Sequence, residues 1–164
     1  MNRFTVFADY FQFVLMDEKS EDDFSAIWTD EALDRMLAVG SDAVCPGTLR
    51  NVDVRVEIEV LSAPPAVDLA KWDHAVEASL NVPSGKLVVM GCTDYLPAAK
   101  RIEVKPGNYQ LLSLASGIDS IQTEWEPADD VYRVYLWLGE PRAPNLIKKW
   151  QRADAWHRRQ IRHL

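Results

Sequence analysis

The chain has 164 residues, 48% of them hydrophobic, and a formal net charge of −7 at neutral pH. This length and apolar content fit one domain with a closed core, in which we expect the six tryptophans to lie, and they exclude a disordered chain. No apolar run approaches the roughly 20 residues that span a bilayer, and the net acidity argues against direct nucleic-acid binding by the body of the protein.

The N-terminus lacks the features of a secretory signal. Met1-Asn2-Arg3-Phe4 leads into a segment interrupted by Asp9 and Gln12, without an apolar region or a small-residue cleavage site. We therefore expect a cytoplasmic protein. In a reducing compartment the two cysteines, Cys45 and Cys92, indicate neither a structural disulfide nor a zinc site. The sequence predicts no metal and no cofactor.

The first half of the chain predicts strands and one short helix. Residues 4–16 carry aromatic and β-branched side chains at both odd and even positions, so both faces of a strand would be apolar. This pattern predicts one central strand. Thr29 or Asp30 offers an N-cap, and the apolar spacing after it predicts a helix over residues 30–39. Over residues 52–61 valine and isoleucine alternate with charged residues, which is typical of an antiparallel sheet with one buried face.

The second half predicts further strands. Residues 73–82 and 86–91 flank Pro83-Ser84-Gly85, a pattern that predicts a β-hairpin. Three more strands are predicted at residues 101–104, 109–115 and 131–138. Seven or more short strands separated by turn signals predict a mainly β fold, an antiparallel β-sandwich with a short helix after the first strand. The periodicity alone does not separate a sandwich from a barrel.

The last twenty residues differ from the rest in charge. Residues 145–164 carry +5, so the other 144 residues carry −12, because the whole chain carries −7. The tail follows two prolines and has apolar residues near helical spacing. We therefore predict a β-sandwich domain over residues 1–144 and a basic, amphipathic C-terminal helix over residues 145–164. Three alternatives stay open: docking on the acidic body of this chain or of a second copy, binding to a membrane or nucleic acid, and exposure to solvent.

Acidic residues are concentrated in the segment from residue 17 to residue 34. It holds eight carboxylates against one lysine: Asp17, Glu18, Glu21, Asp22, Asp23, Asp30, Glu31 and Asp34. Such a density is best tolerated at the surface, where it would steer a basic partner toward the protein. The simpler alternative is a solvated loop and helix start that favours solubility and the helix dipole. We predict that these eight residues form a partner-binding surface.

A second polar group suggests an alternative chemistry. Asp73, His74, Glu77, Cys92 and Asp94 lie on or beside strands expected to neighbour each other, although nothing places their side chains on one face. A Cys–His pair could act as a nucleophile, and a His–Asp–Glu set could hold a metal. The chain has no Gly-rich phosphate loop, no Ser nucleophile between glycines and no dinucleotide fingerprint. We therefore predict no catalytic residues and keep a hydrolase as an alternative.

Several short motifs occur in the order found in a known family. They are Asp9-Tyr10-Phe11-Gln12-Phe13, Trp28-Thr29-Asp30-Glu31-Ala32, Arg50-Asn51 before the alternating strand, residues 72–82, and Lys105-Pro106-Gly107-Asn108-Tyr109. By the order and spacing of these motifs, residues 5–115 resemble the competence protein J-like family. The resemblance implies a small cytosolic protein that inhibits a DNA-entry nuclease in the manner of an immunity protein. It implies no catalytic or ligand residues at particular positions.

These observations predict a non-catalytic protein that binds and inhibits a basic protein, with a nuclease as the leading target. The sequence leaves a homo-oligomer open as a further state. The alternatives are a small-molecule or carbohydrate-binding module with a concave, aromatic sheet face, and a hydrolase of unknown type. A deep pocket with convergent polar groups would favour these alternatives, whereas a flat acidic face would favour the inhibitor.

Overall fold

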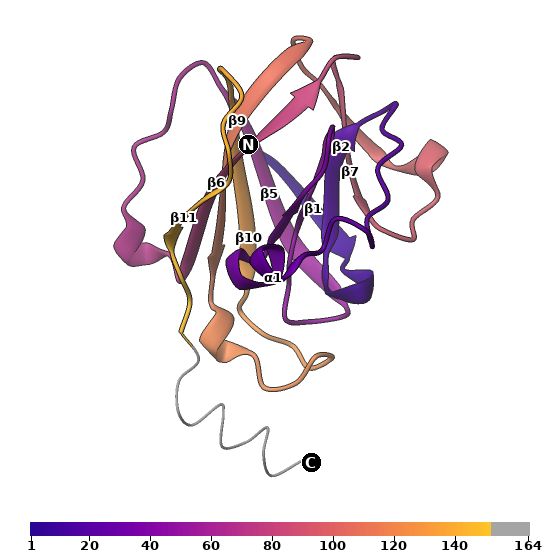
Figure 1. Ribbon diagram of the computed structural model, residues 1–164. Helices are drawn as coiled ribbons and strands as arrows, with labels where there is room; N and C mark the ends of the chain where they lie inside the picture. The colour runs from indigo at the N-terminus through magenta and orange to yellow at the C-terminus, as the bar shows by residue number, and fades with distance from the viewer. Residues whose placement is uncertain (152–164) are drawn as a thin grey trace.

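A computed structural model shows a mainly β protein whose strands form two facing sheets (Figure 1). The structure describes residues 1–151. In chain order the strands are β1 (Asn2–Phe7), β2 (Phe13–Asp17), β3 (Leu37–Val39), β4 (Ala43–Pro46), β5 (Asp53–Leu61), β6 (His74–Val82), β7 (Lys86–Gly91), β8 (Lys100–Glu103), β9 (Gly107–Ser116), β10 (Val131–Leu138) and β11 (Asn145–Lys148). The helical elements are α1 (Asp30–Arg35) and the short 3-10 turns η1 (Asp9–Phe11), η2 (Leu69–Lys71), η3 (Leu96–Ala98) and η4 (Ile118–Ser120).

The six-stranded sheet has the order β1-β5-β10-β9-β6-β11, and the five-stranded sheet has the order β3-β4-β2-β7-β8. Among residues 1–151, eight of the nine strand pairs are antiparallel, and β5 and β10 run parallel. The predicted mainly β, two-sheet arrangement is confirmed. The prediction of a purely antiparallel sandwich is wrong at β10, because this strand returns beside β9 and inserts next to β5.

A buried apolar core fills the space between the sheets. The predicted alternation of β5 is confirmed, since Val54, Val56 and Ile58 are almost fully buried. Phe13 of β2 reaches across from the other sheet and meets the Tyr132 ring edge to face, with ring centroids 6.0 Å apart. Aromatic pairs in this geometry add to the stability gained by burial.

Residues 4–16 form two strands in different sheets, so the prediction of one central strand is wrong. The turn η1 separates β1 from β2, and its residues Tyr10 (φ 57°) and Phe11 (φ 60°) adopt the left-handed backbone conformation. Left-handed residues other than glycine are uncommon, and each costs of order 1–3 kcal/mol. This reversal carries the chain from one sheet to the other, which a pattern of apolar residues does not reveal.

The strands that flank Pro83-Ser84-Gly85 also lie in different sheets, so the predicted hairpin is wrong. β6 pairs with β9 and β11, whereas β7 pairs with β2 and β8. Gly85 has a φ of 71°, and a Cβ at this position would lie 2.8 Å from the carbonyl oxygen of Val104. The predicted turn is therefore present, but it connects a strand of one sheet to a strand of the other instead of closing a hairpin.

The helix α1 ends at Arg35, four residues earlier than predicted. Met36 takes the left-handed conformation and donates its backbone N–H to the carbonyls of Ala32 and Leu33. The residues that follow form β3 and pair with β4. Burial of Leu37 in the core outweighs the helical spacing that the sequence shows.

Asn145–Lys148 form the edge strand β11, which pairs with β6, so the prediction that a helix begins at Asn145 is wrong. The backbone N–H of Trp150 then donates to Nδ1 of His74 at 3.0 Å. The rest of the predicted C-terminal helix, residues 152–164, lies outside the described residues and stays a prediction, as does the basic extension. None of the helices within residues 1–151 is long and apolar enough to cross a membrane.

We expect Phe13→Ala to lower the free energy of unfolding by about 3–5 kcal/mol, because it leaves a cavity between the two sheets. Urea unfolding followed by circular dichroism measures this change. Phe7→Ala is the matched control: Phe7 is 44% exposed, so its loss should cost about 1 kcal/mol or less. Equal costs for the two variants would contradict the placement of Phe13 in the core.

Candidate functional site

The acidic segment covers the outer face of the five-stranded sheet. Its apolar residues explain this position, because Phe24, Ile27 and Trp28 pack on the cluster that includes Val14 and Met90. The side chain of Thr29 caps α1 by accepting the backbone N–H of Ala32 at 3.1 Å. The carboxylates therefore lie on a segment with its own apolar contacts, rather than on a fully solvated loop.

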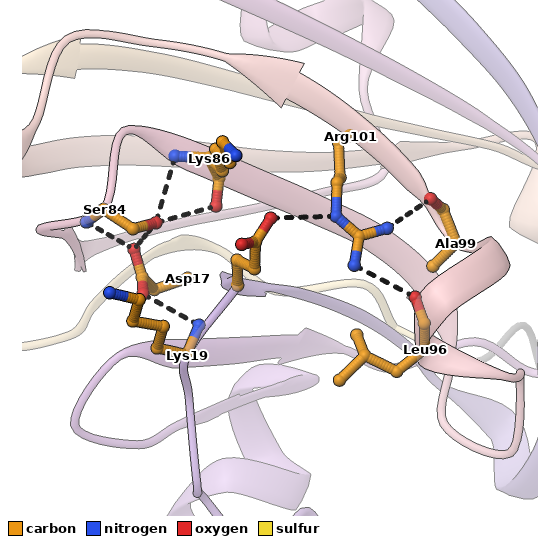
Figure 2. Close-up of polar contacts among 8 residues, drawn as sticks. Asp17, Lys19, Ser84, Lys86, Leu96, Ala99 and Arg101 are labelled. Atoms are coloured by element: carbon orange, nitrogen blue, oxygen red, sulfur yellow. Dashed lines mark hydrogen bonds and ion pairs between the residues drawn. The ribbon is translucent and has the colours of Figure 1, made fainter.

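Asp17, the first predicted partner-binding residue, is buried and serves the fold (Figure 2). One carboxylate oxygen accepts the Ser84 backbone N–H at 2.9 Å and its hydroxyl at 2.6 Å, and the other accepts the Lys19 backbone N–H at 3.0 Å. Burial alone would raise the pKa of Asp17, but these hydrogen bonds outweigh it and hold the pKa below its ordinary value of 3.8. Asp17 thus fastens the end of β2 to the turn between the sheets.

Glu18 is half-buried and forms an ion pair with Arg101 at 3.0 Å. The same guanidinium donates to the carbonyl oxygens of Ala99 and Leu96, as Figure 2 shows. Arg101 therefore links the start of the acidic segment to the connection between β7 and β8. This carboxylate already has a cation, so a partner would have to displace Arg101 to reach it.

Asp22 is half-buried and holds the loop before β4. Its carboxylate accepts the backbone N–H of Asp42 at 2.9 Å, and the Ser20 hydroxyl donates to the carboxylate of Asp42. Burial and the neighbouring charge of Asp22 raise the pKa of Asp42. Burial would raise the pKa of Asp22 too, but the backbone hydrogen bonds of residues 41 and 42 hold it below its ordinary value. These two carboxylates thus share one tightly bonded loop.

The other five predicted residues, Glu21, Asp23, Asp30, Glu31 and Asp34, are exposed. Of these, Asp30, Glu31 and Asp34 line one surface hollow together with Arg35, Pro144 and Leu146. We call these three carboxylates the α1 acidic face. Arg35 donates Nε to the carbonyl of Leu37 at 2.8 Å, and Asp34 is paired with Lys149. The predicted set therefore divides into residues that serve the fold and residues that a partner can reach.

The residues of the alternative hydrolase do not form a common site. Asp73 accepts the backbone N–H of Ile118 at 3.1 Å, and Asp94 accepts that of Gly91 at 2.8 Å. Cys92 belongs to the outer cluster of the five-stranded sheet, and Glu77 pairs with Arg142 at the edge of the other sheet. No group of three or more His, Cys, Asp or Glu within residues 1–151 is placed to hold a metal.

His74 is buried and serves as a structural bridge. Its Nε2 lies 2.6 Å from the carbonyl oxygen of Arg35, while Nδ1 accepts the N–H of Trp150. This pattern requires the neutral ring with its proton on Nε2. Burial, reinforced by the nearby charge of Lys149, lowers the pKa of His74 and favours this neutral form. The ring thus joins the end of α1 to the segment after β11.

The aromatic sheet face that a carbohydrate-binding module would need is covered. On the outer face of the six-stranded sheet, Trp72 and Trp137 are more than nine-tenths buried. The Arg133 guanidinium stacks over the Trp72 ring at 4.9 Å from its centroid and pairs with Glu57 at 3.0 Å. These aromatic side chains pack within the protein, as expected for the tryptophans.

Sequence reasoning missed a buried ion pair at the start of the two parallel strands. Arg50 precedes β5 and Asp130 precedes β10, and the guanidinium Nη2 lies 2.6 Å from the carboxylate. Both side chains are more than nine-tenths buried, and the Tyr132 hydroxyl donates to the second oxygen of Asp130 at 2.8 Å. Burial and the charge of Asp130 raise the pKa of Tyr132 well above its ordinary range. The only signal in the sequence was Arg50 before an alternating strand.

Sequence reasoning also missed four exposed aromatic side chains at one end of the molecule. Trp125 is 66% and Tyr10 is 70% exposed, and Phe7 and Phe11 are also exposed. Phe7 and Trp125 line one surface hollow together with Arg50 and Arg55. The expectation that all the tryptophans lie in the core is therefore wrong for Trp125. Its flanking glutamates, Glu124 and Glu126, were the available signal.

Over residues 1–151, the fold defines a small two-sheet β protein with one parallel strand pair. ComJ from Bacillus subtilis, an inhibitor of the DNA-degrading activity of NucA, shares this fold with a TM-score of 0.63 and 17% identity. The product of crocagin biosynthetic gene J matches with a TM-score of 0.53 and 22% identity; each match covers 85% of this chain and 96% of the other. No protein-family model and no curated protein matches the sequence significantly. The chain thus has the ComJ fold, which confirms the resemblance at that level.

We expect Asp17→Asn to lower the free energy of unfolding by about 2 kcal/mol at pH 7, because the amide cannot accept all three hydrogen bonds. Since the pKa of Asp17 is depressed in the folded state, its contribution is complete above 3.8 and is lost as the pH falls through the lower, folded-state pKa. The stability difference between wild type and variant should therefore shrink in acid.

Chemical unfolding at pH 7, 4 and 3 measures this difference. Glu21→Gln is the matched control, because Glu21 is exposed and its substitution should stay within about 0.5 kcal/mol. If Asp17→Asn were as stable as Glu21→Gln, the structural role of the Asp17 hydrogen bonds would be contradicted.

Proposed function

We propose that this chain is a non-catalytic protein that binds and inhibits a nuclease. The observation that carries the proposal is the fold, which matches 96% of the ComJ chain, and ComJ inhibits the DNA-degrading activity of NucA. The proposal includes a basic protein partner and a cytoplasmic location.

The charge of the surface supports this proposal. A nuclease must attract phosphate, so the rim of its active site is electropositive. The chain carries −7 overall, and the α1 acidic face presents three exposed carboxylates. Complementary charge accelerates encounter and competes with nucleic acid for the same cationic groups.

The geometry of α1 suits this use. Asp30 and Asp34 are four residues apart, so they lie on the same side of the helix. The Thr29 cap and the left-handed Met36 fix both ends of α1, and β3 continues directly into the sheet. The carboxylates therefore project from an ordered backbone. Lys149 pairs with Asp34 at an exposed position, where a cation from a partner could replace it.

The direct test is inhibition. Purified chain is added to a panel of NucA-type nucleases, NucA included, and the degradation of plasmid DNA is followed by gel electrophoresis. We expect inhibition that is complete near an equimolar ratio, because a protein that covers the active site acts stoichiometrically. Full nuclease activity across the panel at a tenfold excess of the chain would contradict the proposal.

The role of the α1 acidic face is tested with Asp30→Asn/Glu31→Gln/Asp34→Asn. We expect the association rate with the inhibited nuclease to fall about tenfold at low salt, and its salt dependence to weaken, because steering carboxylates are lost. Surface plasmon resonance at two salt concentrations measures both effects.

The matched control is Glu59→Gln/Glu103→Gln/Glu140→Gln, which changes the net charge equally on β5, on β8 and after β10. We expect a much smaller effect from this control, and an unchanged melting temperature for both variants within a few degrees. Equal rate losses would mean that only the total charge matters, and that α1 is not at the interface.

A further inference from the structure

Four exposed aromatic side chains gather where β1 ends. Phe7 is 44%, Tyr10 70%, Phe11 39% and Trp125 66% exposed. Phe7 and Trp125 line one hollow, and Tyr10 and Phe11 follow Phe7 in the turn η1. We call these four residues the aromatic end patch. Figure 1 shows η1 and the connection after η4 at the same end of the sandwich. Apolar side chains that cluster in solvent mark interaction sites.

The turn that presents Tyr10 and Phe11 is held in an unfavourable backbone conformation by several hydrogen bonds. The Phe11 carbonyl accepts the Thr48 N–H at 2.8 Å. The Asp9 carboxylate accepts the Tyr10 N–H at 3.1 Å and the Thr93 hydroxyl at 2.7 Å. Left-handed residues with large side chains persist only where the surroundings fix them, and they gather at binding sites. The turn is therefore organised before any partner arrives.

The loop that presents Trp125 is fixed by hydrogen bonds at the residues before and after the tryptophan. Asn51 donates its backbone N–H to the Glu124 carbonyl at 3.0 Å, and the buried Arg50 guanidinium donates to the Glu126 carbonyl at 3.0 Å. A tryptophan on an ordered backbone loses little conformational entropy on binding, which is the property of an interface anchor. These contacts make Trp125 a rigid, exposed aromatic group.

Charged groups around the aromatic end patch indicate what it binds. Four exposed carboxylates lie in the hollow or on the loop that carries Trp125: Asp53, Glu124, Glu126 and Asp129. The exposed cation that lines the hollow, Arg55, donates to the carbonyl oxygen of Ala128 at 3.4 Å. Aromatic faces attract guanidinium and ammonium groups, and neighbouring carboxylates add hydrogen bonds and charge. The chemistry fits arginine and lysine side chains.

We propose that the aromatic end patch is the anchoring surface for a basic protein partner and takes up its arginine or lysine side chains. This inference rests on the proposed function, because it names the contact that holds the same partner. The α1 acidic face steers the encounter and sets the association rate. The aromatic end patch holds the complex and sets the dissociation rate, since buried aromatic anchors carry most of the binding energy.

The variants are Tyr10→Gly and Trp125→Ala, measured by surface plasmon resonance with a nuclease that the wild type inhibits. Glycine suits the left-handed backbone at residue 10, so Tyr10→Gly removes the ring without harming the fold. We expect each variant to raise the dissociation constant at least about tenfold, mainly through faster dissociation. Leu138→Ala, at an exposed residue that ends β10, is the control and should change it less than about threefold.

A second measurement does not depend on the nuclease. A tetra-arginine peptide is titrated into ¹⁵N-labelled protein, and the indole N–H signal of Trp125 is identified by its loss in Trp125→Phe. We expect this signal to shift with arginine peptide and to stay in place with tetraglutamate. The indole signals of the buried Trp72 and Trp137 serve as internal references.

The outcomes separate the two proposals. Inhibition by the wild type with unchanged binding by both variants overturns the anchoring surface and leaves the inhibitor standing. No inhibition, together with a shifted Trp125 signal, overturns the nuclease inhibitor and supports a cation-binding surface. If neither inhibition nor a shift occurs, both proposals fail.

Discussion

The buried ion pair between Arg50 and Asp130 is the constraint on which the other features depend. It lies where two parallel neighbours begin, because Arg50 precedes β5 and Asp130 precedes β10. Two charges removed from water require close contact and further hydrogen bonds, which the Tyr132 hydroxyl and the Glu126 carbonyl supply. The same contacts fix the core position of Tyr132 and the loop of Trp125. Loss of one charge would leave the other buried and unpaired. The pairing of β5 with β10, the core position of Tyr132 and the loop of Trp125 therefore depend on the same ion pair.

Local patterns predicted the strands well where one face is buried and the other is wet. In β5 the alternation was predicted correctly, because apolar and charged residues alternate along the sequence in the same way as buried and exposed side chains alternate in the strand. The same method failed at Tyr10 and at Ser84, where the chain passes between the sheets. Which sheet a strand joins depends on pairing with residues far along the chain. A turn residue such as Gly85 predicts the turn but does not predict which strand pairs with which. The edge strand β11 was missed because its pairing with β6, some 70 residues earlier, overrides the local spacing.

For the candidate site, composition located the acidic segment but did not show which of its carboxylates serve the fold and which are exposed. Asp17 and Asp30 look alike in the sequence, yet one is bonded to Ser84 and the other faces solvent. That difference depends on a contact across 67 residues. Trp125 presents the opposite case, because a tryptophan is expected in a core and here stands outside it. The contacts of Arg50 and Asn51 that hold its loop are set by the tertiary fold, so no local pattern contains them.

The central place of β10 constrains the order in which the protein can assemble during synthesis. β10 lies between β5 and β9, so the six-stranded sheet is two separate pieces until residues 131–138 leave the ribosome. Before that moment the edges of β5 and β9 have no partner, and unpaired edges invite association between nascent chains. A chain stopped short of Asp130 would lack both the joining strand and the carboxylate that neutralises Arg50. The last fifth of the polypeptide is therefore the part that closes the sheet, although most of the strands precede it.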